Sequence, residues 1–484
     1  MIADPREKMV KSDYKALLQE VIRADYPGYF TDIKGREIKQ IDKKSDLYVY
    51  FYLHTLKLLN SGGIHCFICS NSWLDVGYGA WMQEFILNRV TVHLIIDNQA
   101  KRSFASVDIN TVITVMDHPL EKSGTLLTNN NMRFIVFKKA FEEIISADSM
   151  YNLSERMNKL FADDLRVVVK KYSELWQDGF IGDKYEGDKW GGKFLRAPKI
   201  FFTILEKGKD NLVRLGDVAE VKFGIKTGCN EFFYLTKEET EKWGIEEEYL
   251  KPIIISPRES KSMLIKEESL KRLSFICDKE KKEIAGTNCL KYINWGEEQK
   301  FNERRSLSSR RIWWQLSKNN FYKTLWPMIH NERPGVFINN SEFLVDHNLF
   351  EISINNISIY STLMVLFREL YGRCNLGQGA LKTEGIDIKK FLIVSSEFID
   401  IDIHDFDGLI NRDIKSIFIE CGLNPKCEIP IYEQVPKPLP DRKVLDDLVF
   451  DALGLTKEER EDVYRAVCQL VWNRLRKAES MKRR

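Results

Sequence analysis

The stretch SDLYVYFYLHTLKLLNSGGIHCFICS, residues 45–70, decides the fold class. Its first part has apolar residues on nearly every face, which predicts a largely buried helix with Ser45 as its N-cap and Asp46 in its first turn. The Gly62–Gly63 pair ends this helix. The next segment, Ile64–Ser70, is a short apolar run. Such a run is typical of a strand covered on both faces, as in a parallel sheet.

The alternation of helix and strand continues downstream. The sequence predicts a helix at Ala80–Arg89 and a strand at Val90–Asp97. A basic loop, NQAKRSFASVD at residues 98–108, then leads into a last strand at Ile109–Met116. Helices and strands that alternate over short connections predict α/β layering.

Length and composition are those of an ordinary globular protein. With 484 residues, 44% apolar and 30% charged, the chain is expected to form two or three domains, each with its own core. No apolar run reaches the roughly 18 residues that span a bilayer, and the N-terminus lacks the apolar segment of a signal peptide. Nine cysteines without framework spacing fit a reducing compartment. We therefore expect a cytoplasmic protein with no membrane partner.

Six segments together resemble the adenine-specific DNA methyltransferases of the long type IIG restriction–modification kind, which carry a TaqI-like specificity domain. Two of them resemble the later methyltransferase motifs: DLYVYFYLHTLKLLNSGGIHCFICSNSWLDVGYG at 46–79 and NQAKRSFASVDINTVITVM at 98–116. The other four are GGKFLRAPKIFFTILEKGKD at 191–210, VAEVKFGIKTGCNEFFYL at 218–235, LKPIIISPRES at 250–260 and LFRELYGRCNLGQGALKTEGIDIKK at 366–390. The resemblance thus covers nearly the whole chain.

Two motifs of that family do not occur in this sequence. In the family, an F-x-G-x-G loop cradles S-adenosylmethionine, and an NPPY tetrapeptide holds the target adenine against the methyl donor. The resemblance therefore implies the C-terminal half of a Rossmann-like methyltransferase sheet, followed by a mixed α/β DNA-specificity domain and a short helical tail. It implies no catalytic or cofactor-binding residue in this chain. S-adenosylmethionine would serve the complete enzyme, with a separate chain carrying the N-terminal half. In the family the strand at Ile64–Ser70 pairs with the strand that carries NPPY, so without it this apolar strand is expected to have an open edge.

The resemblance also assigns a role to Phe104. In the family an aromatic residue at this position stacks on the adenine that is flipped out of double-stranded DNA. Flipping costs a few kcal/mol, and stacking on an aromatic ring returns roughly 1–3 kcal/mol. The alternative is that Phe104 packs in a hairpin corner. Asp46 would help to order the same pocket, although capping its own helix explains it equally well.

Basic residues beside aromatic ones suit phosphate contact combined with base stacking. The net charge of only +2 is not that of a protein that coats DNA without specificity, so local clusters matter more. The alternative is a solvated basic face with Trp313 and Trp314 turned into the core. The candidate DNA-binding residues are Lys101, Arg102, Arg304, Arg305, Arg310, Arg311 and Arg373.

Two motifs that suggest a ligand are weak. Cys66 and Cys69 form a CxxC pair, but residues three apart in a strand face opposite sides and cannot share one metal ion. No metal site is therefore expected. The segment FGIKTG at 223–228 carries a lone glycine pair, which is weak support for cofactor binding. The resemblance places it in the specificity domain.

We expect four regions along the chain. Residues 1–145 would form the partial methyltransferase domain, with a loop region up to residue 45, and residues 146–194 a helical linker. Residues 195–436 would form the target-recognition domain. In the C-terminal segment 437–484, Lys437–Arg442 is expected to be a linker, followed by two amphipathic helices. Thr456 would cap the second of these together with Glu459.

Two functions remain open at this point. The chain is either the specificity portion of a site-specific adenine methyltransferase that needs an N-terminal partner, or a non-catalytic DNA-binding module or gene remnant. We find no convincing carboxylate cluster for a nuclease, so any cleavage activity would reside elsewhere.

Overall fold

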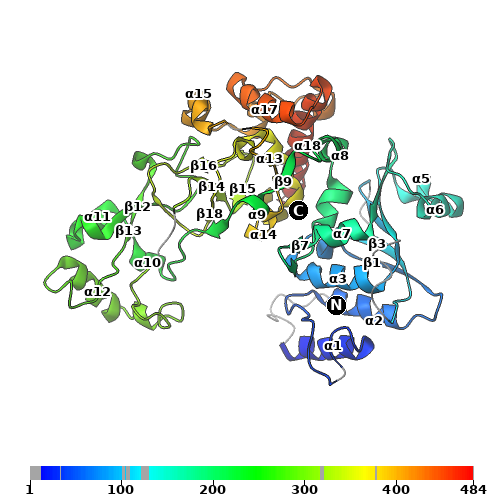
Figure 1. Cartoon of the computed structure of the whole chain (residues 1–484), viewed down its shortest axis with the longest axis horizontal. Coiled ribbons are helices and arrows are strands. Elements are labelled where there is room, and N and C mark those ends of the chain that lie inside the picture. Colours follow the sequence, from blue (N-terminus) through cyan, green and yellow to red (C-terminus); the bar gives the residue numbers. More distant parts are fainter. Residues whose placement is uncertain are drawn as a thin grey trace. The chain divides into compact units, whose positions relative to one another are not determined.

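The computed structural model describes residues 12–32, 34–100, 104, 110–121, 130–316, 321–376, 379–399 and 401–482. The chain divides into two compact units, Met1–Lys199 and Ile200–Arg484 (Figure 1). This division falls close to residue 195, where the target-recognition domain is expected to begin.

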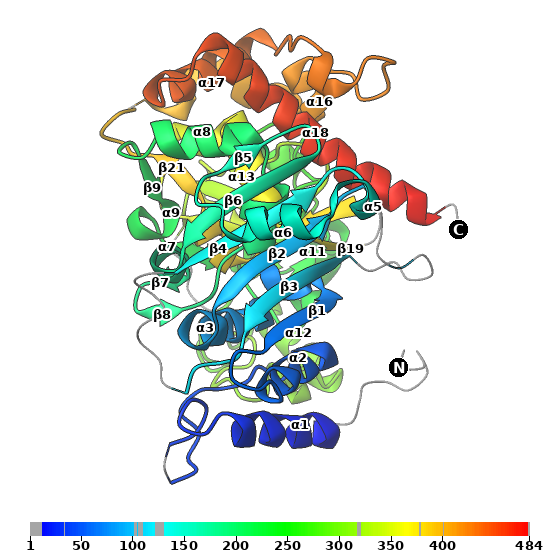
Figure 2. The same ribbon diagram turned by 90° about the vertical axis from the view of Figure 1, so that its right-hand side faces the viewer.

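The first unit is built on a six-stranded mixed sheet in the order β1-β3-β2-β4-β6-β5 (Figure 2). β3 lies between β1 and β2 and is antiparallel to both, whereas β2 and β4 are parallel. The expected α/β character and the three expected strands are confirmed. The strands are β1 (Ile64–Ser70), β2 (Val92–Asn98), β3 (Thr111–Asp117), β4 (Asn131–Phe137), β5 (Leu160–Phe161) and β6 (Leu165–Lys171), beside a small hairpin of β7 (Phe180–Ile181) and β8 (Lys184–Tyr185).

β1 differs from the expectation of a strand covered on both faces. It is the end strand of the sheet and pairs only with β3 among the described strands. Ile64 and Ile68, on one face, are 56% and 40% exposed, whereas His65 and Cys69, on the other, are buried. Cys66 is exposed. The apolar run Ile64–Ser70 is therefore an edge strand with one exposed face, which agrees with the open edge expected in the absence of the NPPY strand.

One expected helix of the first unit has the expected bounds, a second begins later than expected, and a third was not expected. α3 spans Ala80–Arg89 as expected. α2 begins one residue later than expected, because Asp46 is its N-cap and Ser45 instead accepts a hydrogen bond from Trp81 Nε1 at 3.0 Å. The expected loop region before it contains a helix. The helices are α1 (Ser12–Asp25), α2 (Leu47–Lys57), α3, α5 (Phe141–Ile144), α6 (Ala147–Ser154) and α7 (Tyr172–Asp178).

The expectation of a helical linker at 146–194 is wrong. After α6, this segment supplies β6, which pairs with β4 over seven residues and adds to the sheet. Val167 and Val168 of β6 are fully buried. Consecutive β-branched residues favour a strand, and the apolar face of β4 gives them a surface to pack against. The segment thus belongs to the core of the first unit.

The second unit contains several small sheets, and one of its buried clusters combines aromatic and aliphatic residues. Two have four strands, in the orders β10-β18-β14-β16 and β11-β13-β12-β17, and β15-β20-β19 and β21-β9 are smaller. The strands are β9 (Leu212–Arg214), β10 (Val221–Phe223), β11 (Tyr234–Leu235), β12 (Leu250–Ile254), β13 (Arg272–Phe275), β14 (Thr324–Pro327), β15 (Ile329–His330), β16 (Phe337–Ile338), β17 (Leu344–Val345), β18 (Leu349–Ile352), β19 (Arg373–Leu376), β20 (Ala380–Lys382) and β21 (Leu392–Val394).

Helices connect and cover these sheets. No helix in the described ranges is long and apolar enough to cross a bilayer. The helices are α8 (Lys199–Lys207), α9 (Leu215–Val218), α10 (Asn230–Phe233), α11 (Lys237–Trp243), α12 (Asn288–Glu298), α13 (Thr362–Tyr371), α14 (Gly385–Lys389), α15 (Asp407–Asn411), α16 (Ile417–Cys421), α17 (Pro440–Ala452) and α18 (Lys457–Lys482).

The two C-terminal helices confirm one local prediction and correct another. Glu459 N donates to Thr456 Oγ1 at 3.3 Å and Thr456 N donates to Glu459 Oε2 at 2.7 Å, which is the expected capping pair. The expected linker at Lys437–Arg442 is wrong, because its last residues begin α17 and Arg442 is only 2% exposed.

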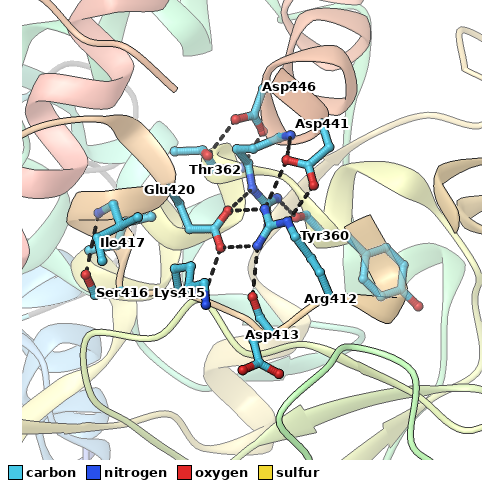
Figure 3. A network of polar contacts seen from close by, with 12 residues as sticks. Tyr360, Thr362, Arg412, Asp413, Lys415, Ser416, Ile417, Glu420, Asp441 and Asp446 are labelled. Atoms are coloured by element: carbon cyan, nitrogen blue, oxygen red, sulfur yellow. Dashed lines mark hydrogen bonds and ion pairs between the residues drawn. The ribbon is translucent and has the colours of Figure 1, made fainter. Parts of the chain in front are cut away.

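A buried ionic network ties α17 to the rest of the second unit (Figure 3). Glu420 accepts from both terminal nitrogens of Arg412 at 2.8 Å and lies 3.3 Å from Arg442 Nε. Asp446 accepts from the backbone and the hydroxyl of Thr362 at 2.7 and 2.6 Å. The C-terminal segment is therefore an integral part of the second unit.

Candidate functional site

The loop that follows β2 carries the candidate stacking residue. The C-terminal end of this loop is held next to the end of β1, where Asn71 N donates to Asn110 O at 3.0 Å, one residue before β3 begins. Phe104 is described and is 46% exposed, so its ring is accessible for stacking. Lys101 and Arg102 lie outside the described residues. The role of Phe104 stays a prediction.

Beside this loop, a polar cluster joins the start of α2 to the turn after β1. Asp46 makes no side-chain cap of its own helix. Instead, its carboxylate accepts from the Tyr78 hydroxyl at 2.6 Å, and Tyr78 lies 3.2 Å from the Tyr48 hydroxyl. Burial raises the pKa of both tyrosines, so they stay neutral donors. This geometry supports the pocket-ordering alternative for Asp46.

Sequence reasoning missed Asp75, which lies in the same turn region. It accepts from Gly192 N at 3.0 Å and from Arg196 Nη1 at 2.6 Å. A Cβ at Gly191 would lie 2.5 Å from its carboxylate, so only glycine fits there. Asp75 therefore holds the π-helical turn Gly191–Arg196 against the turn after β1. Two successive glycines in GGKFLR were the only signal in the sequence.

The four arginines before Trp313 do not share one environment. Arg305 is exposed and has no ionic partner among the described residues. Arg304 forms an ion pair with Glu231, and Arg311, whose side chain is 78% exposed, lies 3.3 Å from Glu280. These three remain candidates for DNA contact.

Arg310 differs from its neighbours because its guanidinium points into the protein. Its Nη2 donates to Thr227 O at 2.8 Å and Lys226 O at 3.2 Å, and its Nη1 donates to Gln315 O at 3.2 Å. Burial lowers its pKa. Most N–H groups of the Arg310 guanidinium are therefore already hydrogen-bonded to carbonyl oxygens of the protein.

The other sequence candidates have mixed outcomes. Trp313 and Trp314 are 8% and 7% exposed, which confirms the alternative that they pack in the core. Arg373 begins β19, but its side chain lies outside the described residues. Cys66 and Cys69 face opposite sides of β1, as expected for residues three apart in a strand. Among the described residues no group of His, Cys, Asp or Glu side chains could hold a metal ion.

The glycine-containing segment FGIKTG does not have the open backbone of a cofactor loop. A Cβ at Gly224 would lie 2.4 Å from the carbonyl oxygens of Val345 and Asp346, so this glycine packs against another segment of the chain. The sequence contains neither F-x-G-x-G nor NPPY. We therefore derive no cofactor chemistry from this chain.

Comparison with known families agrees with the segments singled out above. A family model described as "Eco57I restriction-modification methylase" matches residues 19–104. A second, described as "Type II methyltransferase M.Eco57I, C-terminal domain", matches residues 187–417. The chain belongs to the Eco57I family of restriction–modification methylases. This confirms the resemblance drawn from the sequence, and the first match spans α2, β1, α3 and β2 and ends at Phe104.

Individual relatives of this Eco57I-family chain are distant. It is 23% identical to the "Type II methyltransferase M.AccI" of Acinetobacter calcoaceticus over 326 residues, which are 66% of this chain and 54% of that protein. Two solved structures align with low scores. The type IIG restriction endonuclease BpuSI has a TM-score of 0.41 at 13% identity, covering 98% of this chain and 53% of the other. The type IIL restriction–modification enzyme MmeI, solved with DNA, has 0.46 at 12% identity, covering 93% and 55%. The chain spans about half the length of these relatives.

Proposed function

We propose that this chain is the DNA-specificity portion of a site-specific adenine DNA methyltransferase of a restriction–modification system. Catalysis would need an N-terminal methyltransferase half, which we place on a partner chain and which would bind S-adenosylmethionine. Family membership supports the methyltransferase assignment, and the absent F-x-G-x-G and NPPY motifs support the division of labour. Residues 195–436 would form a TaqI-like target-recognition domain, and the protein would act on double-stranded DNA in the cytoplasm.

The observation that carries this proposal is the open edge of β1. β1 pairs only with β3 among the described strands, and Ile64 and Ile68 leave one of its faces exposed. An apolar edge strand is a template for pairing with another chain. A strand of the catalytic half that adds to this edge would satisfy the free backbone groups, and its side chains would lie beside the two isoleucines on the same face. The target adenine would then lie near Phe104.

In this proposal the chain binds and orients DNA rather than transferring the methyl group. Phe104 would stack on the flipped adenine, which offsets part of the cost of flipping. The Tyr78–Asp46 hydrogen bond would fix the start of α2 beside it. DNA contacts are assigned to six basic residues: Lys101, Arg102, Arg304, Arg305, Arg311 and Arg373.

Co-expression with a chain that carries F-x-G-x-G and NPPY tests this function. We expect the two chains to copurify and to transfer radiolabelled methyl groups to adenine in duplex DNA, whereas this chain alone transfers none. Because Phe104 is exposed, Phe104→Ala should leave folding unchanged and reduce methylation by about 5- to 150-fold, the equivalent of 1–3 kcal/mol. Leu120→Ala is a matched control, since Leu120 is a similarly exposed apolar residue outside the loop.

The missing motifs favour a second function, a non-catalytic DNA-binding module or gene remnant. The co-expression experiment distinguishes this second function from the first. Sequence-specific DNA binding without methyl transfer, even with the added catalytic chain, would support the second function and contradict the first.

A further inference from the structure

The segment Phe223–Gly228, which the proposed function leaves unused, is held rigidly on one side by the chain around β17 and β18. Gly224 N donates to Leu349 O at 3.1 Å, and Ile225 N donates to Val345 O at 2.6 Å. Gly224 is buried against the Val345 and Asp346 carbonyl oxygens, so no side chain fits there. The start of the segment is therefore fixed by backbone packing.

The other side of the segment is held by the basic stretch that precedes Trp313. Arg310 Nη2 bonds the carbonyl oxygens of Lys226 and Thr227. Ser306 Oγ donates to Gly228 O at 3.1 Å, and a Cβ at Gly228 would lie 2.7 Å from that hydroxyl. The carbonyl groups of three successive residues are thus turned toward this stretch and occupied.

What the segment presents outward is positive. Lys226 is exposed and has no acidic partner among the described residues. Among the described residues, none accepts a hydrogen bond from the backbone N–H of Lys226 or Gly228, and both residues are exposed. Thr227 between them is only 1% exposed, so its N–H is not offered to a ligand. Gly228 has a left-handed φ of +78°, and free backbone N–H groups in such turns bind anions. Arg305, one residue before Ser306, adds a second exposed cation.

We propose that Phe223–Gly228 is a preformed phosphate-binding loop for the DNA backbone, with Lys226 as its contact residue. Arg310 is then a positioning residue that acts through the loop rather than a direct DNA contact. A lysine on a loop fixed from both sides loses less conformational freedom on binding than one on a free loop. This inference rests on the proposed function, because it takes DNA as the ligand.

Salt dependence of DNA binding tests the contact. We would measure the dissociation constant of the full chain for a 30-base-pair duplex of random sequence over a range of salt concentrations. Each phosphate contact contributes about 0.9 to the slope of log affinity against log salt. Lys226→Ala should reduce that slope by about 0.9 and weaken binding equally for all sequences. Lys237→Ala, at an exposed lysine in α11, is the control and should leave the slope unchanged.

A double-mutant cycle separates positioning from direct contact. If Arg310 acts through the loop, Arg310→Ala should reduce the slope as Lys226→Ala does, and the double variant should lose no more than either single variant. Arg310→Ala should also speed amide hydrogen exchange at Ile225 and Cys229, whose N–H groups are hydrogen-bonded, whereas Arg311→Ala should not. If Arg310→Ala fails to fold, Arg310→Lys keeps the charge without the planar fork and should still speed exchange. Additive losses would mean that Arg310 contacts DNA itself.

The outcomes distinguish this inference from the function on which it rests. If the unaltered chain fails to bind duplex DNA, the proposed function and the inference both fail. If the unaltered chain binds and Lys226→Ala keeps the full slope, the phosphate-binding loop alone is wrong.

Discussion

The two units differ in how far they bury one element each, β1 in the first unit and α17 in the second. The sheet of the first unit ends in β1, which has a free edge and an exposed face. The second unit instead draws α17 into its interior, where Glu420 and Arg442 are buried in one ionic network. The second unit therefore covers this helix with its own residues, whereas the first unit leaves β1 exposed, and the proposed function places another chain at that edge. Each prediction below tests one side of this contrast, from the largest expected effect on folding to the smallest.

Glu420→Gln should produce the largest loss of stability, because it removes the carboxylate shared by Arg412 and Arg442 and leaves Arg412 paired with Asp441. Breaking a buried ion pair in this way costs about 3–5 kcal/mol. Urea denaturation of the full chain, followed by tryptophan fluorescence of the second unit, measures this loss. Asp462→Asn is the control, since that exposed carboxylate pairs with Arg465 at the surface and should matter by less than about 0.5 kcal/mol.

The pH dependence of the same variant gives a second check. Burial by itself would raise the pKa of Glu420, but its bonds to Arg412 and the nearby Arg442 charge hold this pKa below its ordinary value. The stability from this group is therefore present above the unfolded pKa and is lost as pH falls through the folded pKa. If the urea midpoints of Glu420→Gln and the unaltered chain were equal at pH 7, the buried ionic network would not stabilise the second unit.

Glu351→Gln should have an intermediate effect of the opposite sign. Burial in β18 raises the pKa of Glu351 to about 7, and the backbone N–H of Tyr322 and the charge of Lys222 only partly offset it. The folded carboxyl then keeps its proton between about pH 4.5 and 7, where the unfolded one has lost it, so stability falls as pH rises through this window.

At pH 8 we therefore expect Glu351→Gln to be more stable than the unaltered chain by about 3 kcal/mol, and nearly equal to it at pH 4.5. Thermal unfolding at both values measures the difference. Equal melting temperatures at pH 8 would show that the carboxylate is satisfied when charged.

Ile68→Lys should have the smallest effect on folding and the sharpest effect on association. The side chain is 40% exposed on β1, so the stability of the lone chain should change by less than about 0.5 kcal/mol. A charge on an edge strand opposes pairing with another strand. Size-exclusion chromatography should therefore show loss of the complex with the catalytic half, while Ile419→Lys, at an exposed residue of α16, keeps it. A stable, soluble monomer of the unaltered chain would weaken the partner-chain proposal.

Much of the fold near residues 46–117 was predictable because it depends on local pattern. α3 has the expected bounds, and the three expected strands lie within two residues of their predicted positions. The apolar composition of β1 alone predicted a strand covered on both faces, whereas the absence of the NPPY strand predicted the open edge that the structure has. The strand β6 was missed because the segment that contains it was expected to be a helical linker. Its local sequence does not reveal that β4 lies beside it in the sheet.

The candidate site was predictable only in part. Family motifs selected Phe104, and the structure leaves its ring accessible. The motifs did not reveal Asp75, whose partners lie more than 100 residues along the chain. Nor could the pattern of four arginines show that Arg310 bonds carbonyl groups more than 80 residues away.

By itself, then, the sequence determined the features that arise from residues close together in the chain: the α/β alternation, the capping pair of Thr456 and Glu459, and the motifs of the family. The tertiary structure alone decided which charged side chains are buried and which are exposed. The physical reason is that burial and ion pairing depend on residues brought together from distant segments, as for Arg310 and Arg442, and a local pattern carries no information about such neighbours.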